Sequence, residues 1–98
     1  MINVLALFPI TMDPKVLDDL LSRMIPAIKQ ANGLLALKIS EGRIMSYGGP
    51  PPYSKVIEAS FESLGKFMSW VQTPAARADT ELLNNSGVIR LYYEVNEL

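Results

Sequence analysis

The chain has 98 residues, of which 49% are hydrophobic and 19% charged, with a formal net charge of −1. That length is typical of one domain with its own hydrophobic core, and we expect a single domain over residues 1–98. Because the net charge is so small and the basic residues are scattered, the chain has no electrostatic attraction to nucleic acid or to an anionic membrane. Neither is expected as a partner.

The sequence contains no cysteine and no histidine. This excludes disulfides, zinc–thiolate sites, thiolate nucleophiles and serine–histidine triads, and it leaves only Tyr or Met as haem ligands. Any catalysis would use Asp, Glu, Lys, Arg, Tyr or backbone groups. The apolar start MINVLALFPI lacks a basic region and breaks at Pro9, which indicates neither a signal peptide nor a membrane span. We therefore expect a cytoplasmic protein without a cofactor or a metal.

The first elements in chain order are a strand and a helix. Residues 2–8 form a short, almost continuous apolar run, which is typical of a strand buried on both faces. Asp13 and Pro14 then provide an N-cap and a first helical residue. From there to Ala31 the apolar residues recur at three- and four-residue spacing, which predicts a helix with one buried face.

Pro26 lies inside this helical pattern, where it lacks the amide proton that an interior helical residue donates. It predicts a kink. Either the kink is simply tolerated in a core helix, or the opened turn admits a ligand or water beside Arg23 and Met24. Asn32-Gly33 closes the helix, since both residues tolerate the left-handed conformation of a C-terminal cap.

The middle of the chain predicts two strands joined by a stiff connector. Residues 34–40 alternate as a strand, and Glu41-Gly42 predicts a turn. Residues 43–47 are compatible with an extension of that strand past a bulge. Residues 48–52 combine two glycines with three prolines, which favours a stiff loop over an exposed peptide motif for a partner domain. Residues 53–62 alternate as the next strand.

The last third predicts two helices and a final strand. Ser63 is the predicted N-cap of a helix whose apolar stripe is made of Leu64, Phe67, Met68 and Val71. Trp70 lies beside that stripe, as a packing residue or as a wall of a ligand site. Thr73-Pro74 repeats the cap-and-proline start and predicts a short helix through Leu83. After a turn, residues 88–95 alternate as the last strand.

The order of elements is therefore β-α-β-β-α-β. With right-handed crossovers this order predicts an α+β, ferredoxin-like fold, a four-stranded antiparallel sheet with the helices on one face. The other face of such a sheet would be open, yet its strands offer few charges for water to solvate. Two sheets packed face to face would cover it, so we expect a homodimer closed into an α+β barrel.

The alternation of the strands also predicts a more polar sheet face, at the dimer interface or in the barrel interior. Its members would be Lys38, Glu58, Ser60, Arg90 and Tyr92. Charges close to a buried surface need partners. Either Glu58 pairs with Lys38 or Arg90, within a subunit or across the dimer, or this group anchors a ligand inside the barrel.

With these elements placed, the stretch GPPPYSKVIEASFESLGKFMSWVQTPAARAD resembles the C-terminal half of EthD-like proteins of the dimeric α+β barrel superfamily. The matching positions are Pro52, Tyr53, Phe61, Glu62, Ser63, Leu64, Thr73, Pro74, Ala78 and Asp79. In the first half, Met24-Ile25-Pro26-Ala27 and Asn32-Gly33-Leu34 fit the family's first helix and the turn after it. The family's helix-1 histidine falls on Met24, whose thioether can pack but cannot move a proton.

The resemblance implies a small homodimer with a pocket between sheet and helices. Relatives in the superfamily include cofactor-free monooxygenases of aromatic or quinol substrates, cyclases, isomerases and haem-processing enzymes, and the fold alone does not choose among them. We expect a small apolar or aromatic ligand, bound by a cofactor-independent oxygenase, cyclase or isomerase. The alternative is a module that binds a ligand or dimerises without catalysis, which the loss of the histidine favours.

The candidate site residues follow from this pocket. Asp79 is the candidate general base, because its alanine-rich surroundings could desolvate the carboxylate; an ordinary surface or capping role near Arg77 is the alternative. The candidate binding residues are Arg23, Met24, Tyr53, Trp70 and Tyr92. For Arg23 and Tyr53 the alternatives are an exposed helix cation and a strand-start aromatic.

Overall fold

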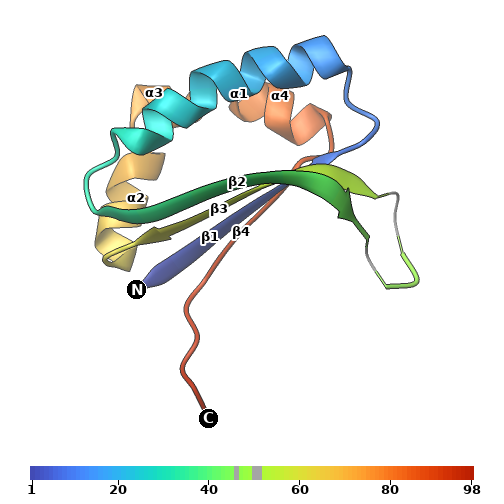
Figure 1. Cartoon of the computed structure of the whole chain (residues 1–98). Helices are drawn as coiled ribbons and strands as arrows, with labels where there is room; N and C mark the ends of the chain where they lie inside the picture. The colour runs from blue at the N-terminus through green and yellow to red at the C-terminus, as the bar shows by residue number, and fades with distance from the viewer. Residues whose placement is uncertain (46, 50–51) are drawn as a thin grey trace.

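The computed structural model describes residues 1–45, 47–49 and 52–98 of the chain. Its elements in order are β1 (Ile2–Pro9), α1 (Pro14–Lys29), β2 (Leu34–Ile44), β3 (Tyr53–Phe61), α2 (Leu64–Val71), α3 (Pro74–Arg77), α4 (Thr80–Asn85) and β4 (Ile89–Tyr93). The strands form one antiparallel sheet in the order β2-β3-β1-β4, and the helices cover one of its faces (Figure 1). This confirms the predicted ferredoxin-like βαββαβ fold.

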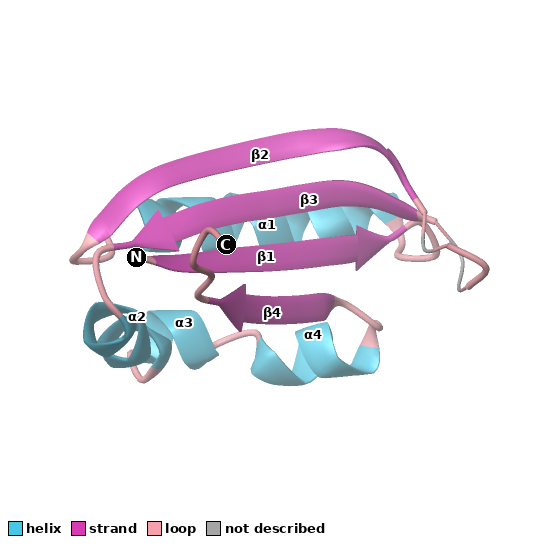
Figure 2. Cartoon of the chain, turned by 90° about the horizontal axis from the view of Figure 1, so that it is seen from below, coloured by secondary structure: helices cyan, strands magenta, loops and turns pink. Residues whose placement is uncertain are grey.

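The sheet is built around β1 and β3, the two central strands (Figure 2). Ala6 lies opposite Ile57 in the register, and both are buried against the helices. Phe8, Leu20 and Phe61 are the largest fully buried side chains. The apolar run of β1 and the apolar stripe of α1 therefore make the core together, as their periodicities predict.

The three predicted helix caps are present. The side chains of Asp13, Ser63 and Thr73 each accept hydrogen bonds from backbone amides two or three residues further along the chain, at 2.8 to 3.3 Å. Each of these bonds satisfies an amide that has no partner within its helix. α1 continues past Pro26 to Lys29, and Gly33 adopts the expected left-handed conformation with φ +88° before β2 begins.

Strand β2 departs from the prediction in two places. It runs to Ile44 instead of turning at Glu41-Gly42: Glu41 pairs with Lys55 of β3, whose Nζ lies 3.3 Å from Glu41 Oε2, and pairing resumes at Ile44 after a register irregularity, which is the bulge that the sequence allowed there. A register irregularity between Leu34 and Ala36 displaces Leu35, which is 57% exposed and does not share the face of Leu37 and Ile39. The predicted stiff loop at 48–52 includes Pro50 and Pro51, which lie outside the described residues.

The helix that begins at Thr73-Pro74 was expected to continue to Leu83, and that expectation is wrong. The chain forms α3 and α4 with Asp79 as the N-cap residue of α4 at φ −109°, ψ 17°, outside the helical region. Pairing between the Asp79 carboxylate and Arg23 of α1 holds this break in place.

The edge strand β4 alternates as predicted, but two of its residues lie on the other face. Arg90 is opposite Ala6 and Tyr92 is opposite Val4, so both side chains share the sheet face that the helices cover. Directly opposed residues in an antiparallel pair project to the same side. Tyr92 packs there on Phe67 of α2 with ring centroids 5.1 Å apart. The predicted polar face therefore loses Arg90 and Tyr92.

The face away from the helices, which we call the open face, keeps the other predicted members. Lys38 and Glu58 lie opposite each other in the register, and Ala36 lies opposite Ser60. Within the described residues no ion pair joins Glu58 to Lys38 or Arg90. Asn3 and Ser40 are also on the open face, and its other members on β3, β1 and β4 are apolar or aromatic: Val56, Leu5, Leu7, Ile89, Leu91 and Tyr93.

Candidate functional site

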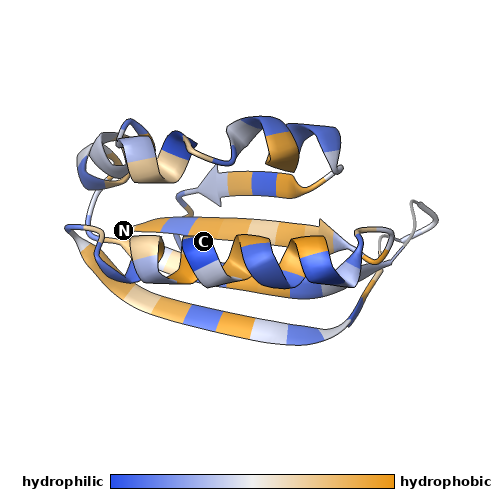
Figure 3. Ribbon diagram, turned by 90° about the horizontal axis from the view of Figure 1, so that it is seen from above, coloured by the Kyte–Doolittle hydropathy of each residue, from blue (hydrophilic) through white to orange (hydrophobic). Residues whose placement is uncertain are grey.

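A cavity of about 740 Å³ lies between the sheet and the helices. Seen from above, β1 and β4 pass between α1 and the segment that carries α2, α3 and α4 (Figure 3). All of these elements contribute to the lining, which includes Met24 and Ile28 of α1, Phe61 of β3, and Phe67 and Trp70 of α2. Because the helices are held apart over β1 and β4, the cavity lies between sheet and helices, as predicted.

Aromatic rings form one wall of the cavity. The centroids of Phe61 and Phe67 are 5.3 Å apart, those of Phe61 and Trp70 5.9 Å, and those of Phe67 and Tyr92 5.1 Å. Tilted aromatic pairs at these distances attract each other beyond the apolar area that they bury. The cluster arises because two α2 residues three apart in the sequence meet the ends of β3 and β4. It offers a flat apolar or aromatic ligand a preformed surface.

The cavity has polar groups, and they are donors rather than acids. The lining side chains that can donate a hydrogen bond are those of Trp70, Gln72, Arg77, Thr80, Arg90 and Tyr92. Within the described part of the chain, the lining contains no Asp or Glu. The arrangement can hold a ligand and stabilise negative charge on it, and it places no carboxylate where a general base would act.

Three of the predicted binding residues meet in this cavity, namely Met24, Trp70 and Tyr92. Met24 comes from α1, Trp70 from α2 and Tyr92 from β4. Arg77 and Arg90 also line it, and neither was predicted there from the sequence. The sequence signal for Arg77 was its position next to Ala76 in the short helix that begins at Thr73-Pro74.

Tyr53 lies elsewhere. It is buried at the start of β3, opposite Pro9 in β1 and Ile44 in β2, and it does not line the cavity. Its position corresponds to the alternative of a strand-start aromatic. A binding role for Tyr53 gains no support from this geometry.

Arg23 and Asp79 also lie outside the cavity lining, and they bind each other. Arg23 Nη2 is 2.9 Å from Asp79 Oδ1, and Nε is 3.4 Å from Oδ2, while Nη1 contacts Asp19 one turn earlier on α1. The Asp79 side chain is 17% exposed and that of Arg23 46%. The hydrogen bond to Asp79, followed by that to Asp19, raises the pKa of the Arg23 guanidinium above its usual value.

This ion pair ties α1 to the break between α3 and α4. Its carboxylate is engaged by a permanent cation in a bidentate pair, the strongest geometry for such a contact. The general-base role of Asp79 therefore stays a prediction without a cavity contact to support it. A structural role follows directly from the geometry.

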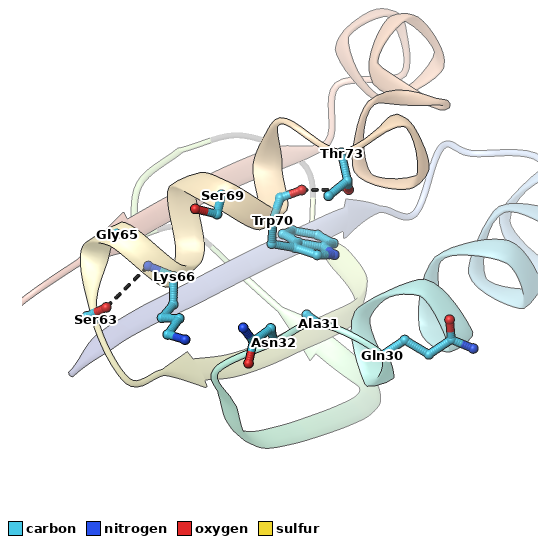
Figure 4. Close-up of a pocket in the computed structure, with 9 residues that line it drawn as sticks. All are labelled: Gln30, Ala31, Asn32, Ser63, Gly65, Lys66, Ser69, Trp70 and Thr73. Carbon is cyan, nitrogen blue, oxygen red and sulfur yellow. Dashed lines mark hydrogen bonds between the residues drawn. The ribbon is translucent and has the colours of Figure 1, made fainter.

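A second, more polar groove of about 660 Å³ lies between the end of α1 and α2 (Figure 4). It is lined by Gln30, Ala31, Asn32, Ser63, Gly65, Lys66, Ser69, Trp70 and Thr73. Trp70 lines both spaces, and its carbonyl accepts a 2.7 Å hydrogen bond from Thr73 Oγ1. The indole thus forms part of the wall between groove and cavity.

Two features are absent from the described residues. No group of three or more His, Cys, Asp or Glu side chains there is placed to hold a metal ion. None of the helices in this part of the chain has the length and apolar character needed to cross a membrane.

Comparisons with known proteins support the architecture. No protein-family model and no curated protein matched the chain. Among solved structures it is similar to an ethyl tert-butyl ether D (EthD) family protein from Bacillus halodurans, with a TM-score of 0.71 and 16% identity over 98% of this chain and 99% of that one. The chain has a ferredoxin-like fold.

Two further structures show the same fold. SnoaB, a cofactor-independent oxygenase from Streptomyces nogalater, matches with a TM-score of 0.72 and 12% identity, covering 99% of this chain and 94% of that one. A dimeric ferredoxin-like protein of unknown function from Thermobifida fusca matches with a TM-score of 0.70 and 14% identity, covering 96% and 90%. The resemblance to EthD-like proteins therefore agrees with the structure in fold, and the activities of these proteins are their own.

Proposed function

We propose that this protein is a homodimer that binds a small apolar or aromatic molecule in the cavity between its sheet and its helices. The observation that carries the proposal is the aromatic wall of Phe61, Phe67, Trp70 and Tyr92 around a space of about 740 Å³. Ligand pockets for small organic molecules typically enclose about 300–1,000 Å³ and are lined mainly by apolar side chains with a few polar groups.

Catalysis and binding without turnover are two versions of this proposal. A cofactor-independent oxygenase, cyclase or isomerase would be in keeping with SnoaB, which shares the fold. Met24 lines the cavity where the family has its histidine, and within the described lining there is no carboxylate. These two observations favour a ligand-binding module, because nothing but tyrosine or arginine is placed there to move a proton.

The cavity can be tested by filling it. Ala76 lines the cavity and its neighbour Ala75 does not, although both belong to α3. Ala76→Leu adds three carbons to the wall and should weaken binding of neutral aromatic probes such as naphthalene derivatives by about 10-fold. Fluorescence of Trp70, the only tryptophan, reports on occupancy of the cavity, and isothermal titration calorimetry gives the affinity.

Ala75→Leu is the matched control, with the same change in size and helix propensity on the exposed side of α3. It should bind as the wild type does. Equal weakening by both substitutions would contradict a ligand site in this cavity, as would failure of all neutral and charged aromatic probes to bind.

Turnover is a separate measurement. Each probe that binds is incubated with the protein in air, oxygen uptake is followed, and products are sought by mass spectrometry. A product that forms with protein and not with the Ala76→Leu variant would identify an enzyme of the cavity. Recovery of every ligand unchanged would favour a module that binds without catalysis.

The proposal of a homodimer is based on the apolar residues of the open face. Leu5, Leu7, Ile89, Leu91 and Tyr93 cover much of it, and Leu91 and Tyr93 are 52% and 46% exposed in the single chain. An apolar surface of this kind is usually covered by a partner. Packing with a second copy of the same sheet would bury it, and the Thermobifida fusca protein with this fold is described as dimeric.

A further inference from the structure

The charged residues of the cavity all carry the same sign. Arg77 of α3 and Arg90 of β4 line it, and within the described residues no Asp or Glu does. Both arginines are exposed as whole residues, so each lines the cavity and also meets solvent. The aromatic wall of Phe61, Phe67 and Trp70 forms its apolar part. The cavity lining therefore combines an apolar, aromatic wall with two cations.

The orientation of Arg90 is fixed by the sheet and by α4. Its place opposite Ala6 directs the side chain to the face that the helices cover, and Nη2 donates a hydrogen bond to Asn84 Oδ1 of α4. A guanidinium has five N–H donors, so this neutral contact leaves both the charge and the other donors available. The side chain is held in position without being neutralised.

Arg77 is not neutralised either. Within the described residues the ion pairs are those of Arg23 with Asp19 and Asp79, of Lys55 with Glu41, and of the N-terminal amine with Glu94. Neither Arg77 nor Arg90 belongs to them. Asp79 is the acidic residue nearest to Arg77 in the sequence, and it is paired with Arg23 instead. Within the described residues neither cation of the cavity lining has a carboxylate partner, so both guanidinium groups are available to an anion.

We propose that this cavity selects aromatic ligands that carry an acidic oxygen, such as aromatic carboxylates, with Arg77 and Arg90 as the anion-binding residues. The ring system would lie against Phe61, Phe67 and Trp70, and the charged end would lie at the two arginines. Guanidinium groups pair with carboxylates through two parallel hydrogen bonds, which fixes orientation as well as charge. This inference rests on the proposed function and specifies the class of its ligand.

The test uses two ligands of equal shape that differ in charge, 2-naphthoate and 2-naphthamide, titrated into the whole protein by calorimetry. We expect wild-type protein to bind the naphthoate at least about 10-fold more tightly, since hydrogen bonds to charged groups exceed those between neutral ones. Arg77→Met and Arg90→Met should each remove much of that preference and leave the affinity for the amide within about 2-fold. Added salt should weaken the naphthoate alone.

Arg43→Met is the matched control, because Arg43 is exposed on β2 and outside the cavity lining, and it should keep the preference. Equal affinity of the wild type for both ligands would overturn the anion preference and leave the proposed function standing. A preference that survives both cavity substitutions would overturn the assignment of Arg77 and Arg90. Failure of both ligands, and of benzoate and benzamide, to bind would count against the proposed function itself.

Discussion

Arg23 joins two acidic residues that lie far apart in the sequence, Asp19 and Asp79. Its guanidinium pairs with Asp19 on the same helix and with Asp79 some 56 positions along the chain. The two partners differ in burial, since the Asp79 side chain is 17% exposed and that of Asp19 72%. Exposed pairs contribute little because water competes for them, whereas water screens the contact with the largely buried Asp79 carboxylate much less.

This difference predicts unequal effects of two isosteric substitutions. Asp79→Asn should lower the midpoint temperature of unfolding by a few degrees, and Asp19→Asn should change it much less. Because Asp79 does not line the cavity, Asp79→Asn should also leave the affinity for aromatic ligands within about 2-fold of wild type. Differential scanning calorimetry at one protein concentration measures the first effect, and titration calorimetry the second.

Asp19→Asn serves as the control for loss of one negative charge beside Arg23. Equal destabilisation by the two variants would contradict the structural role of the Asp79 pair. For any substrate that the protein turns over, a large loss of rate in Asp79→Asn with unchanged ligand affinity would restore the general-base assignment, and full retained turnover would remove it.

At the scale of elements, the sequence predicts most of the fold because the local signals agree with one another. The caps at Asp13, Ser63 and Thr73 lie where side-chain acceptors precede apolar periodicity, and all three form. Long-range pairing decided the exceptions. Glu41-Gly42 looks like a turn in isolation and becomes part of a strand because β3 pairs with Glu41 before it and with Ile44 beyond it.

The face of β4 was also beyond local signals. Its alternation is correct, but alternation alone does not say which set of residues meets the helices. The register with β1 turns Arg90 and Tyr92 toward the cavity and leaves Leu91 on the open face. That arrangement places a cation in the cavity and a leucine on an uncovered surface, the reverse of what burial of apolar side chains alone would favour. Arg90 was not predicted in the cavity because the face of β4 that meets the helices was assigned wrongly. Arg77 was not predicted there because the break at Asp79 was not foreseen.

The turn between α1 and β2 depends on Gly33. Its φ is +88°, and a β-carbon there would lie 2.7 Å from Cβ and 2.9 Å from Cγ of Lys66 on α2. Its carbonyl also accepts a 2.9 Å hydrogen bond from the Glu62 amide. Gly33→Ala would combine an unfavourable left-handed backbone with a steric clash, and should cost about 1–3 kcal/mol of folding free energy.

Gly42→Ala is the matched control, since a β-carbon added to Gly42 in β2 would meet no atom within 4 Å and its backbone is not left-handed. It should be neutral or slightly stabilising. Urea unfolding at a fixed protein concentration measures both variants. Comparable stability of the two would show that the Gly33 turn adjusts without cost, contrary to the prediction.

At the scale of the molecule, the two faces of the sheet have different tasks. The helices and the cavity occupy one face, and the open face has polar residues on β2 and β3 beside the apolar group on β1 and β4. The chain beyond β4 extends away from the sheet on the open side (Figure 1), and Val95 in this segment is 69% exposed. Sequence patterns predict that such a face needs a cover, because β1 is apolar on both sides, but they do not determine its register with a partner.

Leu91 lies in the apolar part of the open face, opposite Leu5 in the register, and provides the test of the homodimer. Wild-type protein at about 10 µM should scatter light with twice the 10.8 kDa mass of the chain. Leu91→Glu would place a charge inside a face-to-face sheet interface and should shift the protein to monomer.

Val16→Glu is the control, because it introduces the same charge on α1, on the other side of the sheet, where Val16 is 40% exposed. It should leave the mass unchanged. A monomeric wild type would contradict the homodimer. Equally stable dimers of both variants would show that the interface is not on this face. Leu91 also belongs to the cavity lining. A folded Leu91→Glu monomer that still binds the naphthoate would show that each subunit carries a complete site.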